Sequence, residues 1–381
     1  MLEFRNGFNG SSEIYGGDTP LISVMDILNN NFITHDKILA HVCVDNNIKE
    51  RFKISYGDVL FQRSSENYED AGTSNVYIDR QNNAIFGGFV IAGKKLKEYD
   101  PICFKYLLDS KYVRNQIIRK AQGAQHINVS QDTLQNVAIY IPNMEEQNKI
   151  GAYLHNIDHL ITLHQRKYEK LRNLKKFFLE KIFPQNGKRV PEVRFAGFTG
   201  DWEQRKLGEL AEFNPKASLP DSFEYVDLES VVGTRIINHR TEKKDSAPSR
   251  AQRLAQPGDV FYQTVRPYQR NNCLFTGAEK SYVFSTGYAQ LRSHGDSYFL
   301  LTMLQKDDFV NSVMDRCTGT SYPAINSNEL AEINVIFPTI IQEQKELGQF
   351  FKNIDNLITL HQRKLEKLQN LKKAALDKMF V

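Results

Sequence analysis

The sequence LITLHQRK occurs twice in the chain, at residues 160–167 and again at residues 357–364. The match extends well beyond these eight residues. When the chain is shifted by 197 positions, residues 147–183 fall on residues 344–380, and 23 of the 37 pairs are identical. A repeat over such a distance indicates the duplication of a large unit and not the short period of a solenoid. The chain is therefore built from two equivalent halves.

Both copies of the repeat are predicted to form long helices. After Gly151 and Gly348, near their starts, neither copy contains glycine or proline, and apolar residues recur at the three- and four-residue spacing of a coiled coil. Each helix would be about 55 Å long, and a helix of that length with one narrow apolar stripe needs a partner. We expect the two copies to pair with each other, antiparallel and with pseudo-two-fold symmetry, through Ile157, Ile161, Leu171, Ile354, Ile358 and Leu368.

The rest of each half is predicted to be a mixed α/β domain, which makes the chain an α+β protein with two such domains and two long helices. A strand that ends at a proline is predicted before each helix, at Pro142 and Pro338. The expected boundaries are residues 1–143 for the first domain, 144–184 for the first helix, 185–201 for a linker containing glycine, proline and basic residues, 202–339 for the second domain and 340–381 for the second helix.

Composition excludes several classes of protein. Of the 381 residues, 41% are hydrophobic and 25% are charged, as in soluble globular proteins, and no apolar run approaches the ~20 residues of a membrane span. The N-terminal sequence lacks the apolar core of a signal peptide. The four cysteines are far apart, so neither a zinc site nor a disulfide framework is predicted, and we expect free thiols in the cytoplasm.

Positive charge is concentrated in the two helices. Residues 147–183 carry 8 Lys/Arg against 3 Asp/Glu, and residues 344–381 carry 8 against 4, whereas the whole chain has a net charge of only +4. The two domains together are therefore acidic.

The expected arrangement suits a particular kind of ligand. Two similar but non-identical domains joined by a pair of long helices suit a linear ligand with two different half-sites, and double-stranded DNA is such a ligand.

The sequence contains no convincing catalytic motif. No Gly-rich cofactor loop is present, and Asn214-Pro215 lacks the second proline and the aromatic residue of an adenine methyltransferase motif. A nuclease is one alternative, because Asp221, Glu242 and Lys244 form a loose pattern whose carboxylates would bind Mg²⁺. We otherwise predict no catalytic residue, metal or cofactor.

Polar loops in the two domains are the candidate DNA-binding residues. Arginine pairs with guanine and Asn or Gln with adenine, whereas Ser, Thr, Tyr and Lys hold phosphates. Two loops follow predicted strands at matching places, and two more lie shortly before the proline-marked strands. The candidates are Arg63, Ser64, Asn67, Gln125 and His126 in the first domain and Arg266, Tyr268, Arg270, Asn271, Ser321 and Tyr322 in the second.

The order of short motifs resembles the specificity subunit of a type I restriction-modification system over nearly the full length. Its second half has WEQRKLGEL at residues 202–210, then Gly258-Asp259-Val260, Pro338, Glu343-Gln344 and Asn353-Ile354-Asp355; its first half has Gly57-Asp58-Val59, Pro142, Glu146-Gln147 and Asn156-Ile157-Asp158. The resemblance implies two target recognition domains that each read one half of a split DNA sequence, and a helical pair that sets the spacer between the halves.

The resemblance also implies partners: two modification subunits that carry the methyltransferase, and restriction subunits with an ATP-driven translocase and nuclease. The specificity subunit itself has no catalysis. Three alternatives stay open: the recognition subunit of a type II-like enzyme that combines methylation and cleavage, the nuclease described above, and a coiled-coil adaptor with no nucleic-acid role.

The chain departs at its start from the motif pattern of the family that it resembles. Leu2-Glu3-Phe4 aligns with the end of the second domain's opening stretch, at Glu212-Phe213, so the first domain lacks a counterpart of WEQRKLGEL. A truncated chain, an alternative start and a recombined allele would each produce this departure. We expect the first domain to lack one edge element.

Overall fold

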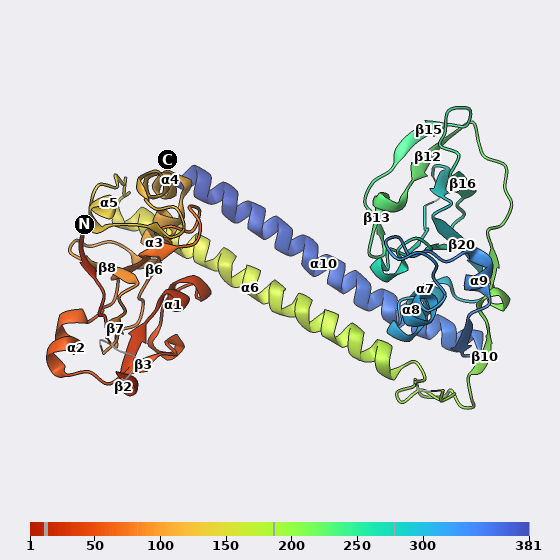
Figure 1. Cartoon of the computed structure of the whole chain (residues 1–381), viewed down its shortest axis with the longest axis horizontal. Coiled ribbons are helices and arrows are strands. Elements are labelled where there is room, and N and C mark those ends of the chain that lie inside the picture. Colours follow the sequence, from red (N-terminus) through yellow and green to blue (C-terminus); the bar gives the residue numbers. More distant parts are fainter. Residues whose placement is uncertain (11–13, 82, 186, 278, 381) are drawn as a thin grey trace. The chain divides into compact units, whose positions relative to one another are not determined.

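The computed structural model describes residues 1–10, 14–81, 83–185, 187–277 and 279–380. The chain forms two compact units. Unit 1 comprises Met1–Arg166 and Gln362–Val381, and unit 2 comprises Lys167–His361. Each unit therefore contains one mixed α/β domain, the first part of one long helix and the last part of the other (Figure 1).

The domain of unit 1 is built on an antiparallel sheet of order β1-β8-β4-β6. Its central strand β4 (Val59–Gln62) is buried along its whole length, and its side chains alternate between two cores. Val59 and Phe61 pack under the helices, whereas Leu60 packs on the opposite face. A second sheet, of order β3-β2-β7, adjoins this opposite face, and β5 pairs with β9.

The elements of unit 1 follow one another in this order: β1 (Leu2–Asn6), β2 (Tyr15–Ile22), α1 (Val24–Asn29), η2 (His35–Lys37), β3 (His41–Val42), α2 (Asn46–Phe52), β4, β5 (Ser64–Ser65), β6 (Ser74–Val76), β7 (Ile85–Phe86), β8 (Val90–Lys95), α3 (Pro101–Asp109), α4 (Lys111–Lys120), β9 (Ile127–Asn128), α5 (Gln131–Gln135) and the start of α6 (Met144–Lys181).

The domain of unit 2 repeats this central sheet with the order β11-β20-β17-β18. Val260 and Tyr262 of β17 (Asp259–Gln263) pack in one core and Phe261 in another, as the side chains of β4 do. The second sheet has the order β15-β12-β19-β16 and repeats the pairings of β3-β2-β7, antiparallel between β12 and β15 and parallel between β12 and β19, with β16 as an additional edge strand. The two domains thus share both sheets and differ in the strands at their edges.

The elements of unit 2 are β10 (Glu203–Lys206), η3 (Leu207–Glu209), β11 (Ala211–Phe213), β12 (Ser222–Val226), η4 (Leu228–Ser230), β13 (Val231–Val232), β14 (Arg235–Ile236), β15 (Arg240–Lys243), β16 (Ala251–Leu254), β17, η5 (Pro267–Gln269), β18 (Cys273–Leu274), β19 (Tyr282–Ser285), β20 (Tyr288–Ser293), α7 (Ser297–Met303), α8 (Asp307–Met314), α9 (Ser327–Ala331), β21 (Asn334–Phe337) and the start of α10 (Ile341–Met379).

The start of each long helix is fixed to its domain by a glutamine. In unit 1, the side chain of Gln147 accepts a hydrogen bond from Asp100 N (2.9 Å) and donates one to Pro142 O (2.8 Å). Gln344 makes the same two bonds in unit 2, to Asp296 N (3.2 Å) and Pro338 O (2.8 Å). The repeated Glu-Gln pair of the sequence therefore marks the junction between domain and helix.

The repeated aspartate of the Asn-Ile-Asp motif joins three elements in each unit. Asp158 accepts hydrogen bonds from Tyr106 Oη (2.7 Å) and pairs with Lys372 Nζ (2.7 Å) of the other helix. Burial raises the pKa of Tyr106, and the neighbouring carboxylate raises it further, so the hydroxyl remains a hydrogen-bond donor. The buried aspartate therefore ties α3 and the end of α10 to the start of α6.

Unit 2 has the equivalent junction with the helices exchanged. Asp355 of α10 accepts a hydrogen bond from Tyr298 Oη (2.8 Å) and pairs with Lys175 Nζ of α6 (2.7 Å). The start of each helix thus meets the end of the other, which makes α6 and α10 antiparallel and confirms the predicted pairing of the two copies. In each unit the helix ends lie side by side (Figure 1).

The structure places the six predicted pairing residues at different depths. Ile157 and Ile354 are 4% and 5% exposed, whereas Ile161, Leu171, Ile358 and Leu368 are half-buried. A lone pair of helices covers only one stripe on each member, so half-burial is expected away from the domains. That these six side chains hold the pair together stays a prediction.

One sequence expectation about secondary structure is wrong. The strand predicted before Pro142 is absent, because residues 137–143 have no strand pairing, whereas its counterpart β21 is formed and pairs with β10. A strand needs a neighbour to satisfy its backbone groups, and β10 belongs to the stretch that has no counterpart in the first domain. That the first domain lacks an edge element stays a prediction.

Candidate nucleic-acid interface

In each domain, the loop after the central strand meets the loop that precedes a short helix. In unit 1, β5 pairs with β9, and Arg63 O accepts a hydrogen bond from Val129 N (2.9 Å). In unit 2, Val265 bridges to Ala324, and Thr264 O accepts a hydrogen bond from Ile325 N (3.0 Å). The structure thus brings together the two candidate loops of each domain at equivalent places.

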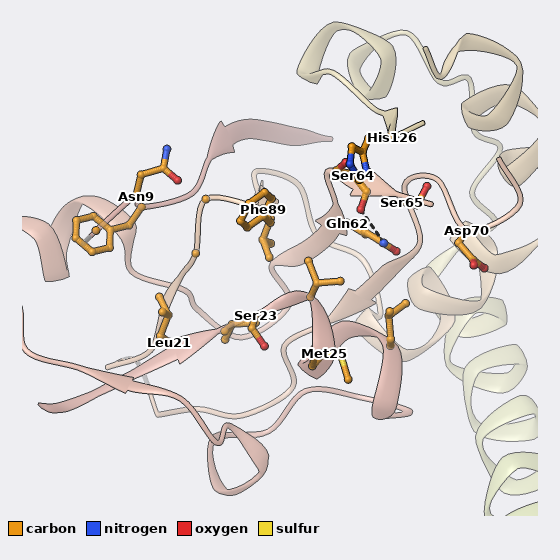
Figure 2. Close-up of a pocket in the computed structure, with 18 of the residues that line it drawn as sticks. Asn9, Leu21, Ser23, Met25, Gln62, Ser64, Ser65, Asp70, Phe89 and His126 are labelled. Atoms are coloured by element: carbon orange, nitrogen blue, oxygen red, sulfur yellow. Dashed lines mark hydrogen bonds between the residues drawn. The ribbon is translucent and has the colours of Figure 1, made fainter. Parts of the chain in front are cut away.

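A buried glutamine donates a hydrogen bond to the backbone of each first loop. Gln62 and Gln263, which end β4 and β17, are 6% and 2% exposed. The amide of Gln62 donates to Ser64 O (2.8 Å), and the amide of Gln263 donates to Val265 O (2.7 Å). These glutamines shape the loops, and Gln62 also lines a pocket of unit 1 (Figure 2).

Three of the five candidates of the first domain line an open pocket of about 670 Å³. Ser64, Asn67 and His126 line it, and Figure 2 shows Ser64 and His126 next to each other at its rim. Gln125 is exposed beside His126, and the guanidinium of Arg63 lies outside the pocket near Gly88 O (3.4 Å). The five residues form one neighbourhood, in which Asn67 is partly engaged by Asp70 (2.7 Å).

Four candidates of the second domain present side chains at the surface. The guanidinium of Arg266 lies 4.3 Å from the ring centroid of Tyr322, so the cation stacks on the aromatic face. Tyr322 is 63% exposed, Tyr268 is 50% exposed, and Ser321 is also exposed. Stacked arginine and tyrosine side chains of this kind contact bases and phosphates in nucleic-acid complexes.

The other two candidates of this loop contact their own domain. Arg270 forms an ion pair with Asp307 (2.6 Å) and donates to Gln305 O (3.1 Å). Asn271 accepts a hydrogen bond from Gly233 N (2.9 Å). These contacts occupy the guanidinium of Arg270 and the side-chain oxygen of Asn271, whereas Arg266 has no such ion pair among the described residues.

Arg266 and Arg270 both have left-handed backbone conformations, with φ of 54° and 55°. Positive φ values are uncommon for residues other than glycine, and such strained conformations occur often in functional loops. They enclose the turn η5, and Arg266 N donates to Pro323 O (2.7 Å) of the second loop. The backbone therefore positions the half-buried Arg266 against the loop that carries Tyr322.

The carboxylates of the alternative nuclease hypothesis do not form a metal cluster. Glu242 accepts a hydrogen bond from Arg240 Nε (2.8 Å), and Asp221 is exposed at the neighbouring turn. In the parts of the chain that the structure describes, no group of three or more His, Cys, Asp or Glu residues could hold a metal ion. Within the same residues, no helix is long and apolar enough to cross a membrane.

Comparison with known proteins places both halves in one family. The model of the type I restriction modification DNA specificity domain matches residues 6–173 and again residues 199–370. The match covers most of the chain and repeats in the two halves that the sequence duplication defines.

Curated relatives and a solved structure agree with this match. The type I restriction enzyme MjaVIII specificity subunit of Methanocaldococcus jannaschii is 23% identical over 317 residues, which cover 74% of this chain and 70% of that protein. The putative MjaX specificity subunit of the same organism is 22% identical over 348 residues, covering 86% and 78%.

The crystal structure of a type I restriction-modification S subunit from M. genitalium has the same fold. It matches with a TM-score of 0.61 at 15% identity and covers 100% of this chain and 94% of that one. The resemblance seen in the sequence motifs is thus confirmed, and the chain belongs to the family of type I restriction-modification DNA specificity subunits.

Proposed function

We propose that each domain of this specificity subunit reads one half of a split double-stranded DNA target through its paired loops. The observation that carries the proposal is the matched position of the loops. His126 in unit 1 stands where Tyr322 stands in unit 2, and Arg63 stands where Thr264 stands, two residues before Arg266, because the two pairs of loops are joined by the same backbone hydrogen bonds. An identical framework with different side chains is what two readers of different sequences require.

The domains lack the strong positive charge of a protein that grips DNA alone, since the basic excess lies in the two helices. We therefore propose that the partner subunits provide part of the binding to the DNA phosphate backbone. We further propose that two modification subunits bind the chain, one for each copy of the repeat, that restriction subunits join this complex, and that the complex works in the cytoplasm.

The helices carry exposed leucines that suit such partners. In unit 1, Leu160, Leu163 and Leu371 are 41%, 38% and 43% exposed. Their repeat equivalents in unit 2 are Leu357, Leu360 and Leu174, at 44%, 45% and 37% exposed. Each unit thus presents the same three leucines, and helices of a partner subunit would bury them.

We propose that the chain itself has no catalytic role. The nuclease alternative is tested by incubating the purified chain with DNA and Mg²⁺. Cutting that is lost in Glu242→Ala would establish that alternative, and the proposal expects no cutting.

The reading of DNA is tested by substituting Arg266, which stacks on Tyr322. Arg266→Ala should relax or abolish recognition of one half-site only, at a cost of about 1–3 kcal/mol if a bidentate guanine contact is lost. Arg270→Ala is the matched control, since Arg270 contacts Asp307 and Gln305 within its own domain. The readout is methylation by the assembled complex on a DNA library randomised in both half-sites.

Relaxation of both half-sites together by Arg266→Ala would contradict independent reading. If Arg266→Ala instead weakens binding to all DNA sequences alike and lowers the salt dependence of binding, Arg266 contacts a phosphate.

A further inference from the structure

A third loop adjoins the two candidate loops of unit 1. It joins β7 to β8 and consists of Gly87, Gly88 and Phe89. Arg63 N donates a hydrogen bond to Phe89 O (2.9 Å), and Nη1 of Arg63 donates one to Gly88 O (3.4 Å). This segment, the β7–β8 loop, is therefore bonded directly to a loop that we propose contacts DNA.

The backbone of the β7–β8 loop is fixed by further hydrogen bonds. Gly87 N donates to Ile22 O (3.0 Å), and Val90 N donates to Gly87 O (2.9 Å). A loop that is held in this way presents its side chain in one place, so a contact made by that side chain costs little ordering entropy.

The side chain of Phe89 points away from the core of its domain. It is 73% exposed, whereas the next most exposed phenylalanine of the described residues, Phe177, is 47% exposed. A ring with so little contact to its own domain buries little apolar surface and adds little to the stability of the fold. Its place on the surface therefore needs another explanation.

Phe89 belongs to a group of exposed apolar side chains around one pocket. It lines the pocket of about 670 Å³ together with Ser64 and His126 (Figure 2). Met25 and Leu28, which are 61% and 45% exposed, line the same pocket. Single apolar side chains are normal on protein surfaces, whereas several around one pocket mark a binding surface. This apolar group shares its surface with the polar candidates of the domain.

Unit 2 has an equivalent loop in which a glycine replaces Phe89. Thr264 N donates a hydrogen bond to Gly287 O (2.9 Å), as Arg63 N does to Phe89 O. The register of the central strands gives the same equivalence, because the residue after each of these positions lies opposite the glutamine that ends β4 or β17. The two halves thus differ by one aromatic side chain at a matched position.

The loop of unit 2 has little room for a side chain at this position. A Cβ on Gly287 would lie 2.9 Å from Cδ2 of Leu228, which packs against the core cluster that contains Phe261. A larger side chain would have to displace Leu228 from this core. The aromatic ring is therefore a feature of unit 1 alone, as expected of a residue that serves one half-site.

We infer that Phe89 reads a thymine in the half-site bound by unit 1, through contact of its ring with the C5-methyl group in the major groove. This inference rests on the proposed function of the loops. A phenyl ring offers neither charge to a phosphate nor a hydrogen bond to a base edge. The thymine methyl is the apolar group that base pairs present in the major groove, so it is the group that the ring can bury.

The experiment measures binding of the assembled complex to synthetic duplexes in which each thymine of the recognised sequence is replaced in turn by uracil. Uracil keeps the base pair and lacks the methyl group. At one thymine of one half-site, uracil should weaken binding roughly fourfold, the effect of leaving one methyl group unburied. Phe89→Ala should bind the thymine and uracil duplexes of that position equally, and it should bind the thymine duplex more weakly than the parent does.

Two further variants serve as controls. Phe89→Leu keeps an apolar side chain and should keep the preference for thymine over uracil. Leu39→Ala, at an 89% exposed position of the same unit outside the pocket, should bind every duplex as the parent does. Thermal unfolding of Phe89→Ala should match that of the parent, since the side chain is exposed.

Several results would overturn the inference. They are a half-site of unit 1 without a thymine on either strand, equal binding of thymine and uracil duplexes by the parent, and a uracil effect that persists in Phe89→Ala. A uracil effect that depends on Phe89 but lies in the half-site altered by Arg266→Ala would also overturn it. If Phe89→Ala weakens thymine and uracil duplexes alike, Phe89 is a wedge between base pairs and the inference is again wrong.

The same measurements separate this inference from the proposed function. The proposed function fails if Arg266→Ala leaves recognition of both half-sites unchanged. This inference alone fails if Arg266→Ala alters one half-site as expected and no thymine contact in the other half-site depends on Phe89.

Discussion

Each unit has one ion pair between its two long helices, Lys372–Asp158 in unit 1 and Lys175–Asp355 in unit 2. Replacement of the lysine in each pair should destabilise the two units by different amounts. The side chain of Asp158 is 8% exposed and that of Lys372 is 25% exposed, whereas Asp355 and Lys175 are 19% and 21% exposed. Lys372→Met leaves a buried carboxylate with one tyrosine as its partner, and breaking a buried pair in this way costs about 3 kcal/mol. Lys175→Met should cost about 2 kcal/mol, because water reaches the more exposed carboxylate.

A second substitution tests whether the charge is the cause. Asp158→Asn alone should be destabilising, since it weakens the bonds to Tyr106 and Lys372. In the Lys372→Met background the same change should be neutral or stabilising, because it removes the unpaired charge. Lys373→Met, at the exposed neighbouring position, is the control and should change stability by less than about 0.5 kcal/mol.

The chain offers a separate readout for each unit. Trp202 is its only tryptophan, is buried and lies in unit 2, so tryptophan fluorescence during denaturant unfolding reports unit 2. Hydrogen exchange of α3, the helix that carries Tyr106, reports unit 1. Equal costs of Asp158→Asn in the two backgrounds would refute the reasoning, as would a larger effect of Lys175→Met than of Lys372→Met.

Three further predictions concern the helices. Gly348→Ala should destabilise unit 2 by about 2 kcal/mol in the same fluorescence assay, although alanine favours helices, because its Cβ would lie 2.1 Å from Asp296 Oδ1; a stabilised variant would contradict this. Ile157→Ala should cost about 3 kcal/mol, seen as faster hydrogen exchange in unit 1, since the side chain is 4% exposed; an unchanged rate would remove it from the core. Insertion of four residues after both Lys170 and Lys367 should lengthen the spacer of the recognised DNA by about two base pairs, from ~6 Å of added helix, without changing either half-site; an unchanged spacer in the methylation assay would contradict a measuring role for the helices.

The sequence predicted features that depend on periodicity and repetition. The two long helices, their pairing and the duplicated domains follow from the 197-residue shift and the apolar stripe, and the structure has all of them. The junctions were not predicted, although the signal was available. Asp158, Asp355, Lys175 and Lys372 are identical between the copies, but which charges meet depends on the antiparallel arrangement in three dimensions.

The candidate interface was predicted at the level of loops and less well at the level of residues. Polar composition identified both loops in each domain. It did not separate Arg266, which stacks on Tyr322, from Arg270, which pairs with Asp307 of α8. The two arginines are four residues apart in the same turn, and only the position of α8 distinguishes them.

The junctions also explain why the two copies of the helix resemble each other more than the two domains do. Each unit takes the aspartate of one copy and the lysine of the other. A change in either helix therefore affects the unit that holds its first part and the unit that holds its last part. The loops have no such double role, because each contacts only its own domain. The side chains at the proposed DNA interface are thus free to differ between the halves, while the repeated helix must keep the residues that serve both units.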